Sequence, residues 1–196
     1  MRVHQRLSRA VSAVTASVLV LAVLAVAQTG SDSRLSNIRI KNFGKVDNNL
    51  YRGAQPKRRD YADLAALGVK TVIDLQQDGE AGESDDVEAA GMKFYRIGLS
   101  DSSWPAPEKT AQFLKLVNDP ANQPVFIHCH GGRHRAGTMT AIYRITHDKW
   151  SADQAYAEMK RYDFESGFGH GSLKDYVYDY AQKTQKSIVV DANTNK

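Results

Sequence analysis

The sequence has a single cysteine, Cys129, among its 196 residues. An internal disulfide is therefore excluded, and so is a structural zinc site built from several thiols. A lone cysteine is most simply a small buried side chain, and the alternative is a reactive thiol. The residues around Cys129 must therefore decide between these two roles.

Acidic side chains are missing from the first 28 residues, which carry Arg2, Arg6 and Arg9 ahead of an apolar stretch over residues 10–27. This stretch ends in Ala25-Val26-Ala27, the small-residue pattern of a cleavage site. We therefore expect a signal peptide over residues 1–27, a tether over residues 28–37, and an extracytoplasmic protein, either periplasmic or secreted. The apolar stretch is also near the lower limit for spanning a bilayer, so an uncleaved membrane anchor is the alternative.

Without this leader, the chain has no large excess of positive charge. The formal net charge of +4 falls by three, the arginines of the leader, to +1. A general nucleic-acid surface is therefore not indicated, and any positive field has to be local. We expect a membrane partner only if the leader is retained, and we expect a monomer.

Apolar runs and helical periodicity alternate along residues 38–185, which we interpret as one domain. The fold class is therefore α/β, with a central, largely parallel sheet flanked by helices, and a flexible tail over residues 186–196. Three caps are expected, at Ser84, at Ser172 and as a Ser151/Gln154 capping box. The predicted strands are 38–43 and 45–46 (forming a hairpin with 50–52), 69–75, 92–99 and 124–128, and the predicted helices are 61–67, 84–90, 108–118, 139–147, 152–160 and 172–185.

The segment from His128 to Thr138, His-Cys-His-Gly-Gly-Arg-His-Arg-Ala-Gly-Thr, joins the strand ending at Ile127 to a helix starting at Met139. Two glycines between Cys129 and Arg135 let the backbone curl into a cradle with its N–H groups turned inward. Such a cradle at a helix N-terminus binds anions. The field that would hold a phosphate would also favour the thiolate of Cys129, which makes the sulfur a nucleophile.

The pattern His-Cys-(five residues)-Arg resembles the signature of the cysteine-dependent protein tyrosine phosphatase superfamily. Its form here is most similar to the dual-specificity branch, especially the atypical plant and fungal members, several of which act on inositol polyphosphates. The run Leu50–Pro56 (Leu-Tyr-Arg-Gly-Ala-Gln-Pro) and the segment that follows it, through Leu75, are similar to the N-terminal half of bacterial dual-specificity-like phosphatases. The resemblance implies a phosphotyrosine-phosphatase-like fold. It also places Tyr51 and Arg52 near the site, although simple surface packing is an equal interpretation for both.

The same resemblance implies roles for individual residues. Cys129 would be the nucleophile and Arg135 the bidentate phosphate clamp, because a planar guanidinium matches two phosphate oxygens. His128 would support the loop structurally. The predicted substrate-binding residues are His130, Gly131, Gly132, Arg133, His134, Ala136 and Gly137.

A leaving group needs a proton, which a carboxylic acid beside the cradle supplies. Asp101 stands where the resembling family holds its general acid, and the alternative is that it only shapes its own turn. The competing acids are Asp78, Glu80 and Glu108. The Trp104–Pro107 segment beyond Asp101 is either a lid or a rigid connector.

Three basic side chains, His130, Arg133 and His134, exceed what a monophosphate needs. They are either a solvated rim or contacts to a substrate with several phosphates. A metal site built from the clustered histidines and Cys129 is disfavoured, because a tight loop cannot aim them all at one ion. We expect neither a metal nor a cofactor.

The sequence departs from the family at Ala136, where the family usually has a serine or threonine that helps the sulfur leave. The leading hypothesis is a phosphatase acting through a phosphocysteine on phosphotyrosine or phosphoserine proteins or on inositol polyphosphates. The alternative is a phospho-ligand binding pseudophosphatase with little turnover. A sulfur-transfer or arsenate-reducing role is a weaker third possibility, because resolving cysteines are absent.

Overall fold

A five-stranded sheet in the order β1-β2-β5-β3-β4 forms the centre of the computed structural model. The structure describes residue 35, residues 37–167 and residues 169–194. Only β1 runs antiparallel to its neighbour, β2, and the other strands pair in parallel. The strands are β1 (Gly44–Lys45), β2 (Leu50–Ala54), β3 (Thr71–Gln76), β4 (Lys93–Leu99) and β5 (Val125–Cys129).

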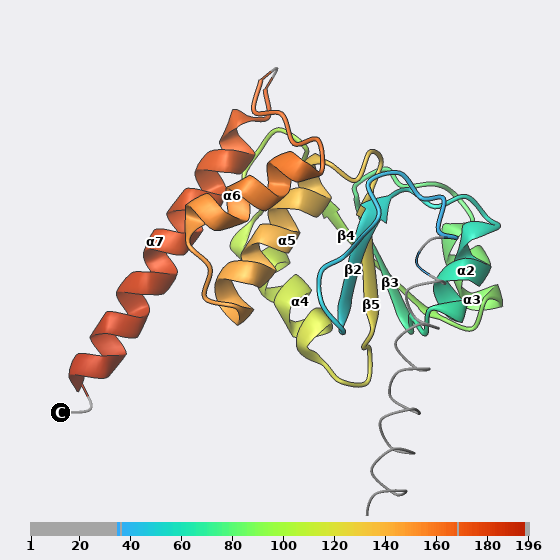
Figure 1. The fold of residues 1–196 in the computed structure, drawn as a ribbon, viewed down its shortest axis with the longest axis horizontal. Coiled ribbons are helices and arrows are strands. Elements are labelled where there is room, and N and C mark those ends of the chain that lie inside the picture. The colour runs from blue at the N-terminus through green and yellow to red at the C-terminus, as the bar shows by residue number, and fades with distance from the viewer. Residues whose placement is uncertain (1–34, 36, 168, 195–196) are drawn as a thin grey trace, which may run out of the picture. The chain divides into compact units, whose positions relative to one another are not determined.

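Helices cover both faces of this sheet (Figure 1), with α2 and α3 on one side and α4 to α7 on the other. The helices are α2 (Asp60–Ala66), α3 (Glu83–Ala89), α4 (Pro107–Asn118), α5 (His134–His147), α6 (Ala152–Arg161) and α7 (Gly171–Thr194). The predicted α/β class with a largely parallel sheet flanked by helices is thus confirmed.

The central strands are buried on both faces, as their near-continuous apolar runs predict. Every residue of β2, β3 and β5 is buried. One core packs the sheet against α4 and α5, with Ile73, Phe113 and Ile127 fully buried in it. A second core joins α5, α6 and α7 around Leu173 and Val177. Cys129 belongs to the first core, so packing fixes the position of its strand.

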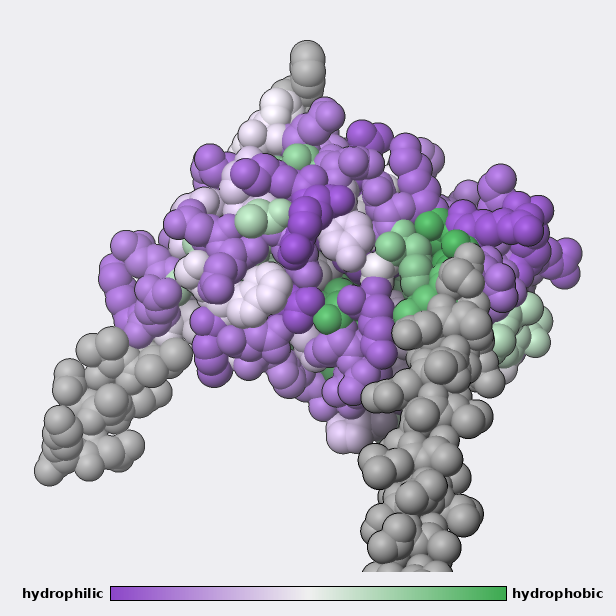
Figure 2. All heavy atoms as spheres, viewed as in Figure 1, coloured by the Kyte–Doolittle hydropathy of each residue, from purple (hydrophilic) through white to green (hydrophobic). Residues whose placement is uncertain are grey.

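Hydrophilic side chains cover most of the face seen in Figure 2. Among the described residues, Trp104 is the one large apolar side chain that is exposed, at 48%. Its ring meets Tyr176 of α7 edge-on, with 5.5 Å between the ring centroids. The Trp104–Pro107 segment therefore packs on the last helix.

Several predicted boundaries are corrected. The helix after the signature begins at His134, five residues before the predicted start. The first hairpin strand shrinks to Gly44–Lys45, because residues 38–43 form turns and irregular chain. The Ser151/Gln154 capping box is present, but the other two caps are not. Gly82 precedes α3 without a side-chain cap, and Ser172 lies inside α7, where its hydroxyl donates to the carbonyl of Ser102.

The described residues from Arg39 onward form one compact unit. The predicted leader over residues 1–27, and all but two residues of the predicted tether, lie outside the described residues. Within the described part of the chain, the helices lack the combined length and apolar character that a bilayer span requires. Helix α7 continues through residues 186–194, where the sequence predicts a flexible tail.

Candidate active site

The segment Cys129–Arg135, called the signature loop below, leads from the last residue of β5 into the first turn of α5. Gly132 has a φ of +66°, and a Cβ at this position would lie 2.5 Å from the backbone nitrogen of Ala54. Only glycine therefore allows the loop to turn this tightly against the end of β2. The glycine predicted for the cradle is required by this close approach.

Three consecutive carbonyls of the signature loop accept hydrogen bonds from residues of the segment 42–55. Asn42 Nδ2 donates to Gly131 O at 2.9 Å, the backbone N–H of Gln55 donates to His130 O at 3.3 Å, and Arg52 Nη2 donates to Gly132 O. In a trans peptide the following N–H points opposite to the carbonyl. The amides of Gly131, Gly132 and Arg133 are therefore turned the other way, which gives the loop the character of an anion cradle.

A cavity of about 730 Å³ opens in front of Cys129. It brings together most of the predicted site residues. Its lining residues are Gln76, Gln77, Asp78, Glu80, Leu99, Asp101, Cys129, His130, Gly131, Arg133, His134, Arg135 and His170. Gly132, Ala136 and Gly137 do not line the cavity: Gly132 faces β2, Ala136 is fully buried, and Gly137 packs toward Met159 and Arg52.

Arg135 is half-buried beside the cradle. Its Nη1 lies 3.5 Å from Leu99 O, a long contact, and its Nε is buried without a hydrogen-bond partner among the described residues. A buried guanidinium with an unsatisfied donor favours an anion beside it. Arg135 thus lines the same cavity as Cys129 and keeps a hydrogen-bond donor without a partner among the described residues.

Asp101 lies in the exposed loop after β4 and lines the same cavity as Cys129. Two contacts join this loop to the start of α7: His170 Nδ1 lies 2.6 Å from Asp101 O, and Ser172 donates to Ser102 O. The competing acids Asp78 and Glu80 also line the cavity, whereas Glu108 is an exposed residue of α4 outside it.

His134, the first residue of α5, is stacked on His170 with 3.6 Å between ring centroids and meets Phe164 edge-on. Burial, and then the charges of His170 and Arg133, lower the pKa of His134 to about 4. His134 is therefore neutral at pH 7. The basic rim predicted from three side chains therefore loses the charge of His134 near neutrality.

The hydroxyl of Thr138 is bonded within the helix. Thr138 Oγ1 donates to the carbonyl of His134 at 2.9 Å, an ordinary bond to the residue four positions earlier. Ala136 supplies no hydroxyl and is completely buried. Neither residue therefore offers the sulfur of Cys129 the hydroxyl that is usual in the resembling family.

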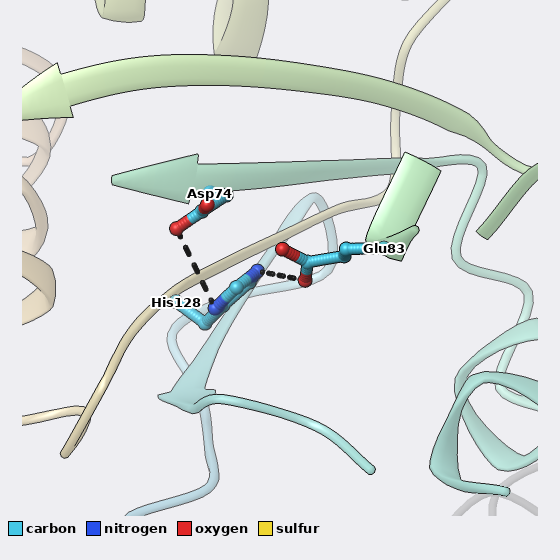
Figure 3. A group of neighbouring side chains, drawn as sticks. All are labelled: Asp74, Glu83 and His128. Carbon is cyan, nitrogen blue, oxygen red and sulfur yellow. Dashed lines mark ion pairs between the residues drawn. The ribbon is translucent and has the colours of Figure 1, made fainter. Parts of the chain in front are cut away.

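His128, directly before Cys129, is fully buried in a charged network behind the signature loop (Figure 3). Its Nε2 lies 2.9 Å from Glu83 Oε1, and its Nδ1 lies 3.9 Å from Asp74 Oδ1. Arg96 joins both acids, at 2.7 Å from Asp74 and 3.5 Å from Glu83. The supporting role of His128 stays a prediction, and this network is the set of contacts through which His128 would exert it.

Glu83 is the hub of that network. Besides His128, it accepts hydrogen bonds from Tyr61 at 2.7 Å and from Gln55 at 2.8 Å. Burial alone would raise the pKa of Glu83, but the hydrogen bonds and charge of these partners outweigh it and lower the pKa to about 2. The same bond and burial raise the pKa of the Tyr61 hydroxyl. Glu83 is thus a carboxylate at every physiological pH.

The acceptor atoms of Asp74 and Glu83 and a ring nitrogen of His128 lie within 4.8 Å of one another, a spacing that a metal ion could bridge. Arg96 already supplies a positive charge to both carboxylates, and Gln76 donates to Asp74. Both carboxylates of the set are therefore already paired with protein side chains.

The sequence motifs do not point to Asp74, Glu83 and Arg96, and for Arg52 they leave a place near the site and surface packing as equal interpretations. One signal was available: Asp74 interrupts the apolar run Val72-Ile73-Asp74-Leu75, and a charge in a strand buried on both faces requires a partner. The partner Arg96 lies on the neighbouring strand, and Glu83 lies at the start of α3.

Two relatives are similar to this protein over somewhat more than 60% of the chain. OCA1 of Mycosarcoma maydis, named as a tyrosine-protein phosphatase, is 32% identical over 126 residues, which cover 62% of this chain and 79% of OCA1. The inositol diphosphatase SIW14 of Saccharomyces cerevisiae is 28% identical over 130 residues, which cover 63% of this chain and 46% of SIW14. The match thus spans about half the length of SIW14.

Solved structures give the same result. The core catalytic domain of the PP-IP phosphatase SIW14 from S. cerevisiae, in complex with citrate, superposes with a TM-score of 0.65 at 26% identity, covering 79% of this chain and 94% of that one. A cysteine-to-serine variant of P. aeruginosa TpbA in complex with pTyr gives 0.60 at 25% identity, covering 69% and 82%. The family model described as "Tyrosine phosphatase family" matches residues 37–195. With the cradle, the cavity and these matches in agreement, the chain belongs to the tyrosine phosphatase family.

Proposed function

We propose that this protein hydrolyses phosphate monoesters through a phosphocysteine intermediate. The single observation that carries the proposal is the signature loop, in which three consecutive carbonyls are bonded to residues of the segment 42–55, so that the amides of residues 131–133 point the opposite way. A cradle of this kind beside a thiol has no evident use in packing. It is suited to a tetrahedral anion.

In the first step the thiolate of Cys129 attacks phosphorus in line with the departing oxygen, forming a sulfur–phosphorus bond as the phosphorus–oxygen bond breaks. The loop amides and the Arg135 guanidinium stabilise the equatorial oxygens. Because α5 is 14 residues long and begins in the loop, its dipole adds to this positive field. Asp101 protonates the leaving oxygen and then removes a proton from the water that hydrolyses the phosphocysteine.

We propose a phosphorylated protein or an inositol polyphosphate as the substrate, since the relatives include a protein named as a tyrosine phosphatase and one named as an inositol diphosphatase. The cavity holds the cations Arg133 and Arg135 together with three acids, Asp78, Glu80 and Asp101. Salt dependence discriminates between the two classes, because binding of a highly charged polyphosphate weakens steeply with ionic strength.

A second candidate function is capture of a phospho-ligand with little turnover. Ala136 carries no hydroxyl and Thr138 is bonded to His134, so the second chemical step lacks a group that assists the departure of sulfur in the resembling family. A burst of leaving group followed by a very slow steady state would favour this candidate.

The deciding experiment incubates Cys129→Ser with a panel of phosphopeptides and inositol phosphates and asks which compound is retained. The wild type is then assayed on the retained class, and Asp101→Asn is compared on esters of low and high leaving-group pKa. We expect Asp101→Asn to lose about 10²-fold in rate on the poor leaving groups and far less on the good ones. Full activity of Cys129→Ser would overturn the mechanism.

We also propose export, on the strength of the arginines, the apolar stretch and the Ala-Val-Ala pattern in residues 1–27. The mass of the protein recovered from the extracytoplasmic fraction tests this. Loss of 27 residues supports a cleaved leader, and the full mass in a membrane fraction supports an anchor. Recovery in the cytoplasm would overturn export.

A further inference from the structure

Arg52, in the middle of β2, is completely buried. In the parallel pairing of β2 with β5, Arg52 lies opposite Ile127 and Ala54 lies opposite Cys129. Alternate residues of a strand share a face, so Arg52 is on the same face of the sheet as Cys129. A Cβ built on Gly137 of α5 would lie 3.9 Å from Arg52 Nη1, which places the guanidinium between β2 and α5, behind the signature loop.

The contacts of Arg52 are few for a buried cation. Its Nη2 donates to Gly132 O, and its Cζ lies 4.1 Å from the centre of the Tyr162 ring. Its Nε and Nη1 are buried without a hydrogen-bond partner among the described residues. Glu158 is the carboxylate whose charge acts on Arg52, but it is already paired with Arg144 at 2.9 Å. A buried charge is ordinarily paired with a counter-ion, so Arg52 lacks its usual partner.

Arg52 nevertheless keeps its charge. Burial lowers the pKa of Arg52 to about 10, and the attraction of Tyr162, Cys129 and Glu158 opposes the shift. The side chain is therefore a cation at neutral pH. Of the three groups that attract it, Cys129 also lines the cavity.

We propose that Arg52 is a positioning residue for Cys129: it holds the left-handed turn at Gly132 through its hydrogen bond and places a buried positive charge behind the signature loop, where it stabilises the thiolate. The inference rests on the proposed phosphatase function. It adds to Arg135, which lines the cavity, a second arginine that is buried between β2 and α5 and does not line it. The ionisable groups that line the cavity with the thiol are Asp78, Glu80, Asp101, His130, Arg133, His134, Arg135 and His170, and the buried His128 directly precedes Cys129 in the chain.

Reaction of the thiol with iodoacetamide tests this without requiring any turnover. The thiolate displaces iodide and forms a thioether, and Cys129 is the only cysteine, so the label reports on it alone. The alkylation rate is measured from pH 4 to pH 9 for the wild-type full chain and for three variants. Arg52→Lys keeps the charge, Arg52→Gln keeps a donor without the charge, and Arg52→Met keeps neither.

We expect the midpoint of the alkylation profile to stay near the wild-type value in Arg52→Lys. In Arg52→Gln and Arg52→Met it should move upward by about one pH unit, so that alkylation below the midpoint is roughly tenfold slower. With a phosphate ester as substrate, kcat should fall more in Arg52→Gln and Arg52→Met than in Arg52→Lys. KM should change by less than about threefold in all three variants, because Arg52 does not line the cavity and the substrate does not touch it. If Arg52→Met does not fold, the Lys and Gln pair isolates the charge.

The matched control is Val177→Ala, which removes buried volume from the α5–α7 core without touching the loop. It should lower stability and leave the alkylation midpoint unchanged. Wild-type midpoints in both Arg52→Gln and Arg52→Met, with circular dichroism showing folded protein, would overturn the inference. Because alkylation is read without substrate, this outcome is distinct from a failure of the proposed phosphatase function, in which no ester is hydrolysed by any of the proteins.

Discussion

Glu83 Oε1 lies 2.9 Å from His128 Nε2, which ties the first residue of α3 to the residue directly before Cys129. The two residues are 45 positions apart in the sequence, and both are buried. The carboxylate therefore fixes the end of β5, and with it the start of the signature loop, to helix α3, which lies on the face of the sheet opposite to α5. Several consequences of the network and of the loop can be measured.

Glu83→Gln should lower the free energy of unfolding at pH 7 by about 3 kcal/mol, because it leaves His128 and Arg96 short of a buried negative charge. The folded-state pKa of Glu83 is held near 2, below its ordinary value of 4.5. Its contribution is thus complete above pH 4.5 and is lost as the pH falls toward 2. Urea unfolding from pH 7 to pH 2.5 checks both points, and the variant should show a shallower slope below pH 4.5.

The control for this variant is Glu108→Gln, which changes an exposed acid in the first turn of α4. We expect its stability to stay within about 0.5 kcal/mol of the wild type. Equal losses in the two variants would mean that the Glu83–His128 contact contributes nothing specific.

Gly132→Ala should reduce activity on the order of a hundredfold, because a displaced signature loop misplaces both the amides and Cys129. The added Cβ would meet the backbone nitrogen of Ala54 at 2.5 Å, and the φ of +66° disfavours any L side chain. Steady-state kinetics and thermal melting measure the two effects. Gly131→Ala is the comparison, since its Cβ would lie 3.2 Å from the movable side chain of Arg133. A Gly131→Ala defect as large as that of Gly132→Ala would contradict this account.

His134→Phe should flatten the pH dependence of stability between pH 6.5 and pH 4. The pKa of His134 is lowered to about 4, so over this interval the unfolded chain binds a proton that the folded chain does not. Stability of the wild type therefore falls as the pH is lowered through this window, and the histidine is responsible for part of the fall. Urea unfolding at half-unit intervals gives the curves. Parallel wild-type and variant curves throughout would show that the stacked histidine is not the cause.

Ala136→Ser should speed hydrolysis of the phosphocysteine and so raise the steady-state rate after the burst. The reason is that a hydroxyl at this position would bond the sulfur as it leaves, as serine or threonine does in the resembling family. Rapid-quench measurement of burst and steady-state phases with a chromogenic ester follows both steps. Thr138→Val is the control, because the hydroxyl of Thr138 donates to His134 O inside α5. A lower steady-state rate in Ala136→Ser would refute the idea.

The sequence predicted the sheet well because its signals are local. The apolar runs before Cys129 and around Ile73 specify buried parallel strands, and Gly68 and Gly91 mark the ends of the first two helices of the unit. The sequence predicts the start of α5 five residues too late, because residues 134–138 show no apolar periodicity that would indicate a helix.

The candidate site was predictable where one motif contains it and not where distant segments meet. Cys129, Arg135 and the loop glycines are neighbours in the sequence, so their geometry follows from spacing. Arg52 contacts this loop from β2, and Glu83 contacts His128, the residue directly before the loop, from α3. Periodicity contains no information about such contacts.

The docking of the Asp101 loop on α7 limits how the site can work. His170 and Ser172 bind the carbonyls of Asp101 and Ser102, so the backbone that carries Asp101 is fixed to the start of the last helix. Any movement of the loop that carries Asp101 has to break these two contacts or take the start of α7 with it, which ties one wall of the Cys129 cavity to the last helix of the domain.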